Sequence, residues 1–172
     1  MSESPRRATI VSGYFNPLHV GHLRMMNAAR EMTGYLIIIV NNDAQQLLKK
    51  GRIILPLEDR LEVVRALRVA DEVVAAVDED NSVRATLRAV RARHPRAGLI
   101  FANGGDRTGT GNINESGVAA ELGIELRFGT GGQEKADSST RIVAALGTGQ
   151  ALPVPARSPE DAGVPATGNY RH

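Results

Sequence analysis

The sequence predicts an α/β fold in which helices cover both faces of a doubly wound, five-stranded parallel sheet. Short apolar runs rich in Val and Ile alternate with stretches in which apolar residues recur at helical spacing, the pattern of successive β–α–β units. One run, Tyr35–Val40 (YLIIIV), is apolar at every position, as in a strand buried on both faces. The length of 172 residues suits one domain. Together these features are typical of a Rossmann-like fold.

Five segments are predicted to be strands because each is a short run of β-branched or aliphatic residues next to turn-forming residues. In chain order they are Ala8–Gly13, Tyr35–Asn41, Glu72–Val77, Gly98–Asn103 and Ile124–Phe128.

The segments between these strands have helical spacing of apolar residues and are predicted to be helices. Pro56 stands just before one helix, and Gly34 and Gly123 follow two others, as expected for residues that begin and end helices. In chain order the helices are Val20–Met32, Ala44–Lys49, Leu57–Arg68, Ser82–His94, Asn114–Leu122 and Ser138–Leu146.

The composition changes near the end of the helical pattern. Beyond Gly147 the chain contains four prolines and several glycines without helical spacing, which indicates a disordered tail or a linker. We therefore expect an N-terminal extension over residues 1–7, a folded domain over 8–147 and a tail or linker over 148–172. Segments of this composition commonly connect domains, so the sequence is compatible with a further domain fused after it.

The composition also excludes several classes of protein. There is no cysteine, which excludes disulfides and thiolate metal sites. The formal net charge of +2 is too small to predict a nucleic-acid surface. No run approaches the roughly 20 apolar residues that span a bilayer. We expect a cytoplasmic protein with neither a nucleic-acid nor a membrane partner.

The segment Gly13–Met26 (GYFNPLHVGHLRMM) carries two of the four histidines, where the first strand passes into the first helix. His19 and His22 are three positions apart, so their imidazoles lie on one face of the first turn. The free N–H groups of a helix N-terminus favour an anion, above all a phosphate. Gly21 leaves room for a ligand to approach. Zinc would need a third ligand, which is absent at a matching spacing, so no residue is predicted to bind a metal directly.

The string GYFNPLHVGH resembles the G-x-F-D-x-x-H-x-G-H signature of the HxGH nucleotidyltransferase superfamily, which includes cytidylyltransferases and several adenylyltransferases. With three further motifs in the family's order, the resemblance extends from Ala8 to Leu146. It implies that His19 and His22 are catalytic. The nucleotide-binding residues that it implies in this segment are Gly13, Tyr14, Phe15, Asn16 and Gly21.

Two of the further motifs lie in the second half of the chain. The string DSSTRI (residues 137–142) resembles the family's S-[ST]-T-x-I segment, which opens the last helix onto the triphosphate, and FANGGDR (101–107) resembles its G-G-D turn. Alone, each could equally be an ordinary helix cap or a glycine turn. The nucleotide-binding residues implied here are Gly105, Asp106, Ser138, Ser139, Thr140 and Arg141.

The remaining motif is NNDAQQLLKKGRIILPLEDR (41–60), which resembles the stretch after the second strand of cytidylyltransferases. There an aspartate, a lysine six positions on and an arginine seventeen positions on recur, matching Asp43, Lys49 and Arg60. The resemblance implies a catalytic role for Lys49 and nucleotide binding by Arg60. We expect Lys49 and Lys50 to lie in a flexible loop, and a purely solvated loop is the alternative.

One residue departs from the family pattern, since Asn16 stands where the signature has aspartate. An amide can donate and accept hydrogen bonds, but it brings no charge to a magnesium ion or a substrate cation. A direct contact between Asn16 and a metal is therefore not expected.

The implied reaction is nucleotidyl transfer, in which an acceptor oxygen attacks the α-phosphorus of a nucleoside triphosphate and pyrophosphate leaves. The resemblance implies Mg²⁺ as cofactor and a homodimer. It leans to the cytidylyltransferase branch, above all to the cytidylyltransferase domains that are fused to phosphoenolpyruvate mutase in fosfomycin biosynthesis. That implies CTP and a small phosphonate or phosphate acceptor, 2-hydroxyethylphosphonate first. Two alternatives stay open: an adenylyltransferase acting on heptose phosphate or on nicotinamide or nicotinate mononucleotide, and a nucleotide-binding module without catalysis.

Overall fold

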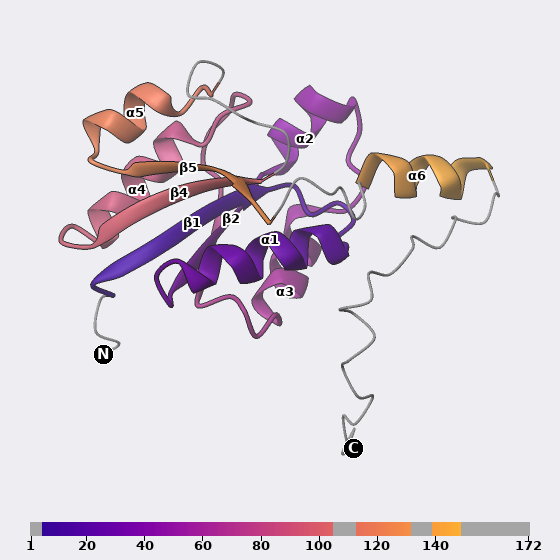
Figure 1. The fold of residues 1–172 in the computed structure, drawn as a ribbon. Coiled ribbons are helices and arrows are strands. Elements are labelled where there is room, and N and C mark those ends of the chain that lie inside the picture. Colours follow the sequence, from indigo (N-terminus) through magenta and orange to yellow (C-terminus); the bar gives the residue numbers. More distant parts are fainter. Residues whose placement is uncertain (1–4, 105–112, 132–138, 149–172) are drawn as a thin grey trace, which may run out of the picture.

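The structure, a computed structural model, describes residues 5–104, 113–131 and 139–148. Within these ranges, five parallel strands form one sheet in the order β3-β2-β1-β4-β5 (Figure 1), which confirms the predicted doubly wound fold. The strands are β1 (Arg7–Gly13), β2 (Leu36–Val40), β3 (Glu72–Ala75), β4 (Gly98–Gly104) and β5 (Glu125–Thr130).

The helices differ from the predicted ones mainly at their ends. Their bounds are α1 (Val20–Glu31), α2 (Asp43–Lys50), α3 (Leu57–Arg65), α4 (Arg84–Arg93), α5 (Ser116–Glu121) and α6 (Ser139–Thr148). The prediction of a flexible loop at Lys49 and Lys50 is wrong, because both lie in the last turn of α2. That helix ends at Gly51, whose φ of +69° closes it with a left-handed residue.

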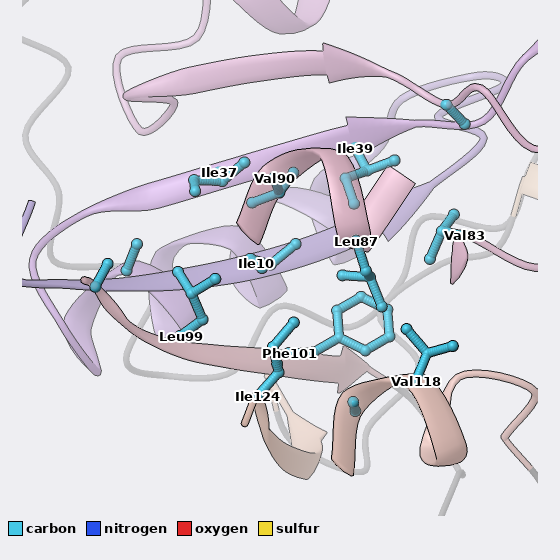
Figure 2. Close-up of a cluster of buried hydrophobic side chains, with 14 residues drawn as sticks. Ile10, Ile37, Ile39, Val83, Leu87, Val90, Leu99, Phe101, Val118 and Ile124 are labelled. Atoms are coloured by element: carbon cyan, nitrogen blue, oxygen red, sulfur yellow. The ribbon is translucent and has the colours of Figure 1, made fainter. Parts of the chain in front are cut away.

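The core consists of two apolar layers, one on each face of the sheet. Helices α4 and α5 cover one face, where Leu87 and Val118 belong to one buried cluster with Ile37, Ile39 and their neighbours (Figure 2). Helices α1 and α3 cover the other face, onto which the alternate residues of β2 point (Figure 1). Every residue of β2 is buried, as the unbroken apolar run predicts.

The strand order places a topological switch between β1 and β4. From the carboxyl ends of these two strands the chain leaves to helices on opposite faces, so a crevice opens there. Helix α6 lies beyond this carboxyl edge, past the start of α1 and the end of α2 (Figure 1). Among the described helices, none combines the length and the apolar character needed to cross a bilayer.

Helix α1 also packs against the residue that follows β5. A Cβ built on Gly131 would lie 2.8 Å from the Met25 Cα atom, and the φ of Gly131 is +89°. Gly123 has a similar left-handed φ of +62°, but nothing lies within 4 Å of a Cβ built there. A substitution at Gly123 therefore tests the left-handed φ alone, whereas one at Gly131 tests the left-handed φ together with the close contact with α1.

We expect Gly123→Ala to reduce the free energy of unfolding by about 1–2 kcal/mol through the left-handed φ alone. Gly131→Ala should reduce it by about 1–3 kcal/mol more, because the methyl group collides with the backbone of α1. Urea denaturation of both variants measures the difference. Equal reductions in the free energy of unfolding would show that α1 does not pack closely against Gly131.

Candidate active site

Helix α1 begins with a cap made by its own two histidines. His19 is the N-cap residue, and its Nδ1 accepts a hydrogen bond of 3.2 Å from the Gly21 N–H. The Nδ1 of His22 accepts one of 3.3 Å from the His19 N–H, which completes a reciprocal capping box. Because Nδ1 is the acceptor in both rings, the proton of each neutral imidazole is on Nε2.

The two imidazoles stack, with ring centroids 3.8 Å apart. The ring of Phe15 meets His22 edge-on, at a centroid distance of 5.1 Å. Burial, and secondarily the neighbouring His19, lower the pKa of His22 to about 4. At neutral pH His22 is therefore an uncharged N–H donor, which suits a phosphate oxygen at the start of a helix.

The loop between β1 and α1 is held by the buried ring of Phe15. A Cβ on Gly13 would lie 2.8 Å from that ring, so glycine is needed here to make room for Phe15. Phe15 itself is 2% exposed and its side chain belongs to the core, while its binding of nucleotide stays a prediction.

Asn16, predicted to bind nucleotide, is also buried, and its side chain explains the departure from aspartate. Its Nδ2 donates to Gln46 Oε1. The orientation of Gln46 is fixed, because its Oε1 also accepts from the Ile54 N–H and its Nε2 donates to Asp43 Oδ1 and the Leu55 carbonyl. An aspartate in place of Asn16 would set a second acceptor oxygen against Gln46 Oε1. The amide is therefore required by its neighbour.

Arg60, predicted to bind nucleotide, has a structural role in the protein. Its guanidinium is only 1% exposed and donates to the carbonyls of Tyr14 (3.0 Å), Asn41 (2.6 Å) and Leu55 (2.9 Å) and to Asp43 Oδ1 (2.7 Å). Four of its five N–H donors are thus used inside the protein. Arg60 therefore joins the ends of β1 and β2 to the start of α2, and its binding of nucleotide stays a prediction.

The first turn of α6 meets the histidine loop. Ser139 Oγ donates a hydrogen bond of 2.9 Å to the Pro17 carbonyl, and Lys50 Nζ donates one of 3.1 Å to Thr140 Oγ1. Arg141 follows in the same turn. These contacts bring the first and last predicted motifs together. The predicted Gly105, Asp106 and Ser138 lie outside the described residues.

A cleft of about 440 Å³ opens at the carboxyl edge of the sheet, beside the histidine loop. Gly13, Tyr14 and Lys49 line it, and Lys49 Nζ is 4.8 Å from the centre of the Tyr14 ring. Asn103 and Glu115 also line the cleft, although the sequence did not select them as site residues. A signal was present, since Asn103 ends a predicted strand and Glu115 is the second residue of a predicted helix, both at the edge where ligands bind.

The sequence pattern of the family described as cytidylyltransferase-like matches residues 10–145. The chain is 44% identical over 75 residues to an FAD synthase of Pyrococcus abyssi, covering 43% of this chain and 51% of that protein. It is 37% identical over 113 residues to the bifunctional protein HldE of Streptomyces coelicolor, covering 64% of this chain and 22% of that protein. The matches therefore span about half of the first relative and about a fifth of the second.

Two solved structures have a similar fold. One is a lipopolysaccharide core biosynthesis protein from Thermoplasma volcanium, with a TM-score of 0.52 and 17% identity, covering 71% of this chain and 93% of that one. The other, from Vibrio parahaemolyticus, is provisionally named a nicotinate-nucleotide adenylyltransferase. Its TM-score is 0.60 at 16% identity, covering 87% of this chain and 92% of that one. At these identities the likeness concerns the fold alone.

Replacing Arg60 should reveal its structural role. We expect Arg60→Met to lower the free energy of unfolding by about 3–5 kcal/mol, because it leaves Asp43 and three carbonyls without their donor. The control is Arg88→Met, which breaks an exposed pair with Glu121 and should cost less than about 1 kcal/mol. Urea denaturation measures both. Similar losses would mean that Arg60 does not anchor the loop.

The lowered pKa of His22 predicts a pH dependence of stability. Between about pH 6.5 and 4 the unfolded chain binds a proton at His22 and the folded chain does not, so the free energy of unfolding decreases as the pH falls through this range. In His22→Asn the amide oxygen can replace Nδ1 as the cap acceptor but does not titrate. The decrease should therefore be smaller in the variant than in the wild type. Parallel profiles of the free energy of unfolding against pH in the wild type and the variant would contradict a neutral His22.

Proposed function

The chain belongs to the cytidylyltransferase-like family, and on this basis we propose that it catalyses nucleotidyl transfer. An oxygen of an acceptor phosphate or phosphonate forms a bond to the α-phosphorus of a nucleoside triphosphate. The bond from that phosphorus to the bridging oxygen breaks, and pyrophosphate leaves with the electron pair. The observation that supports this most is the histidine cap, which combines two neutral Nε2–H donors with the start of α1.

The protein's contribution is positioning and charge stabilisation, because this transfer needs no covalent intermediate on the enzyme. His19 and His22 donate to the phosphate oxygens on which negative charge grows. Lys49, which lines the cleft, attracts the acceptor anion. Ser139 links the start of α6 to the histidine loop, so that Thr140 and Arg141 can face the same triphosphate.

Mg²⁺ is part of the proposal as an ion that neutralises phosphate charge when bound. Among the described residues no three His, Cys, Asp or Glu side chains are grouped for a metal. This fits an ion that keeps most of its ligands as water and substrate phosphate oxygens, as Mg²⁺ commonly does. Asn16 is not among its ligands in this proposal.

The first candidate reaction is transfer of CMP from CTP to a small phosphonate, 2-hydroxyethylphosphonate. Its support is the stretch from Asn41 to Arg60 that resembles cytidylyltransferases. Of the three residues matched there, Lys49 lines the cleft, whereas Asp43 and Arg60 bond to each other. The homodimer, the fused domain, the domain bounds and the cytoplasmic location stay predictions.

The second candidate is adenylyl transfer to a larger acceptor such as a sugar phosphate or a mononucleotide. FAD consists of flavin mononucleotide joined to AMP, so the name of one relative indicates an adenylyl transfer. The cleft volume of about 440 Å³ also lies in the range of about 300–1,000 Å³ that holds drug-sized ligands. A two-carbon phosphonate would fill only part of it.

Pyrophosphate release distinguishes the candidates. CTP or ATP with Mg²⁺ is incubated with 2-hydroxyethylphosphonate, glycerol 3-phosphate, ethanolamine phosphate, heptose 1-phosphate, nicotinamide mononucleotide or flavin mononucleotide. We expect release with one nucleotide and a narrow set of acceptors. His22→Asn should reduce turnover about 10²–10³-fold through the lost Nε2–H donor.

The control for that loss is Arg88→Met, whose side chain is exposed and pairs with Glu121 away from the cleft. It should leave turnover unchanged. Tight nucleotide binding without release in any mixture would contradict the proposal and favour a binding module.

A further inference from the structure

Asn103 carries an unused hydrogen-bond donor in the cleft. It lies near the carboxyl end of β4, is 8% exposed and lines the cleft together with Phe101 and Gly104. Within the described part of the chain, its Nδ2 is buried and makes no hydrogen bond. Buried donors without a partner are uncommon because desolvation is then uncompensated. A ligand oxygen in the cleft would supply the missing partner.

Glu115 offers the complementary acceptor in the same cleft. Its side chain is buried, and Oε1 accepts a hydrogen bond of 3.1 Å from the Val83 N–H at the start of α4. That bond fixes the carboxylate at the wall of the cleft. The second carboxylate oxygen has no hydrogen-bond partner among the described residues.

Two other polar side chains of the cleft are already engaged. Asn41 Nδ2 donates to Gln45 Oε1 at 2.9 Å, and Ser82 Oγ pairs with Asp80. Lys49 also lines the cleft, and its ammonium group suits the phosphate or phosphonate group. The part of a ligand inside the cleft therefore meets the unpartnered donor of Asn103 and the second carboxylate oxygen of Glu115, next to the polar side chains of Ser12, Asn81 and Asn114.

We propose that Asn103 and Glu115 select an acceptor whose organic part carries a hydroxyl group; this rests on the proposed nucleotidyl transfer. A hydroxyl both accepts and donates, so its oxygen can take the Nδ2–H of Asn103 while its proton goes to Glu115. One hydroxyl or two adjacent ones satisfy both residues. An ammonium group could donate to Glu115 but could not accept from Asn103. An alkyl group could do neither.

The test uses matched acceptors and isosteric variants. The pairs are 2-hydroxyethylphosphonate with ethylphosphonate, and glycerol 3-phosphate with propyl phosphate. Wild type should prefer the hydroxylated member in kcat/KM by at least about tenfold, as expected when buried polar groups would otherwise lose their partner. In Asn103→Asp, which replaces the donor with an oxygen, and in Glu115→Gln, this preference should largely disappear. The KM for the nucleotide should not change.

Two results would overturn the inference. One is an equal loss of kcat/KM for both members of a pair in Asn103→Asp, which would mean that Asn103 has only a structural role. The other is a raised KM for the nucleotide with an unchanged preference between acceptors, which would assign Asn103 to the nucleotide. Circular dichroism and Asn103→Ser serve as a check in case Asn103→Asp does not fold.

Direct binding separates this inference from the proposed function. Calorimetry measures the affinity of each acceptor in the presence of a non-hydrolysable nucleotide analogue. A hydroxyl preference that Asn103→Asp abolishes supports the inference even if no pyrophosphate is released, in which case only the proposed reaction fails. Turnover without such a preference, or no binding by either member of both pairs, overturns the inference.

Discussion

The candidate site depends on the buried guanidinium of Arg60. Its donors reach the carbonyls of Tyr14, Asn41 and Leu55 and the carboxylate of Asp43, so a single side chain joins the ends of two strands, one helix start and one loop. No other side chain could make all four of these hydrogen bonds in this way, because only arginine has five donors in a rigid planar group. The loop that carries the histidines begins at one of these anchored carbonyls.

From this anchor the polar contacts continue to the histidines. Asp43, held by Arg60, accepts from Gln46, which in turn accepts from Asn16. The loop then leads into the cap of α1, where backbone N–H groups occupy the Nδ1 atoms of His19 and His22. The backbone thus determines which ring nitrogen carries the proton. In the proposed reaction the histidines act as oriented neutral donors, and Lys49 supplies positive charge.

The sequence predicts the fold because apolar spacing depends on local periodicity, and it predicts the histidine pair because the pair forms a local motif. It does not predict the role of Arg60, since a charged residue in a matching motif position suggests a ligand contact, whereas its burial is set by distant carbonyls. Asn103 and Glu115 are similar: only the packed structure reveals which polar atoms lack partners. The amide at position 16 is explained only by the structure, in which its Nδ2 donates to Gln46 Oε1.

The state of the imidazole nitrogens tests the central claim most directly. Nitrogen-15 NMR of histidine-labelled protein distinguishes a protonated nitrogen from an unprotonated one in each ring. For His22 the account predicts an unprotonated Nδ1 and a protonated Nε2 at pH 7, persisting to about pH 5 because the pKa is about 4. A cationic His22 at pH 7, or a proton on its Nδ1, would contradict the account.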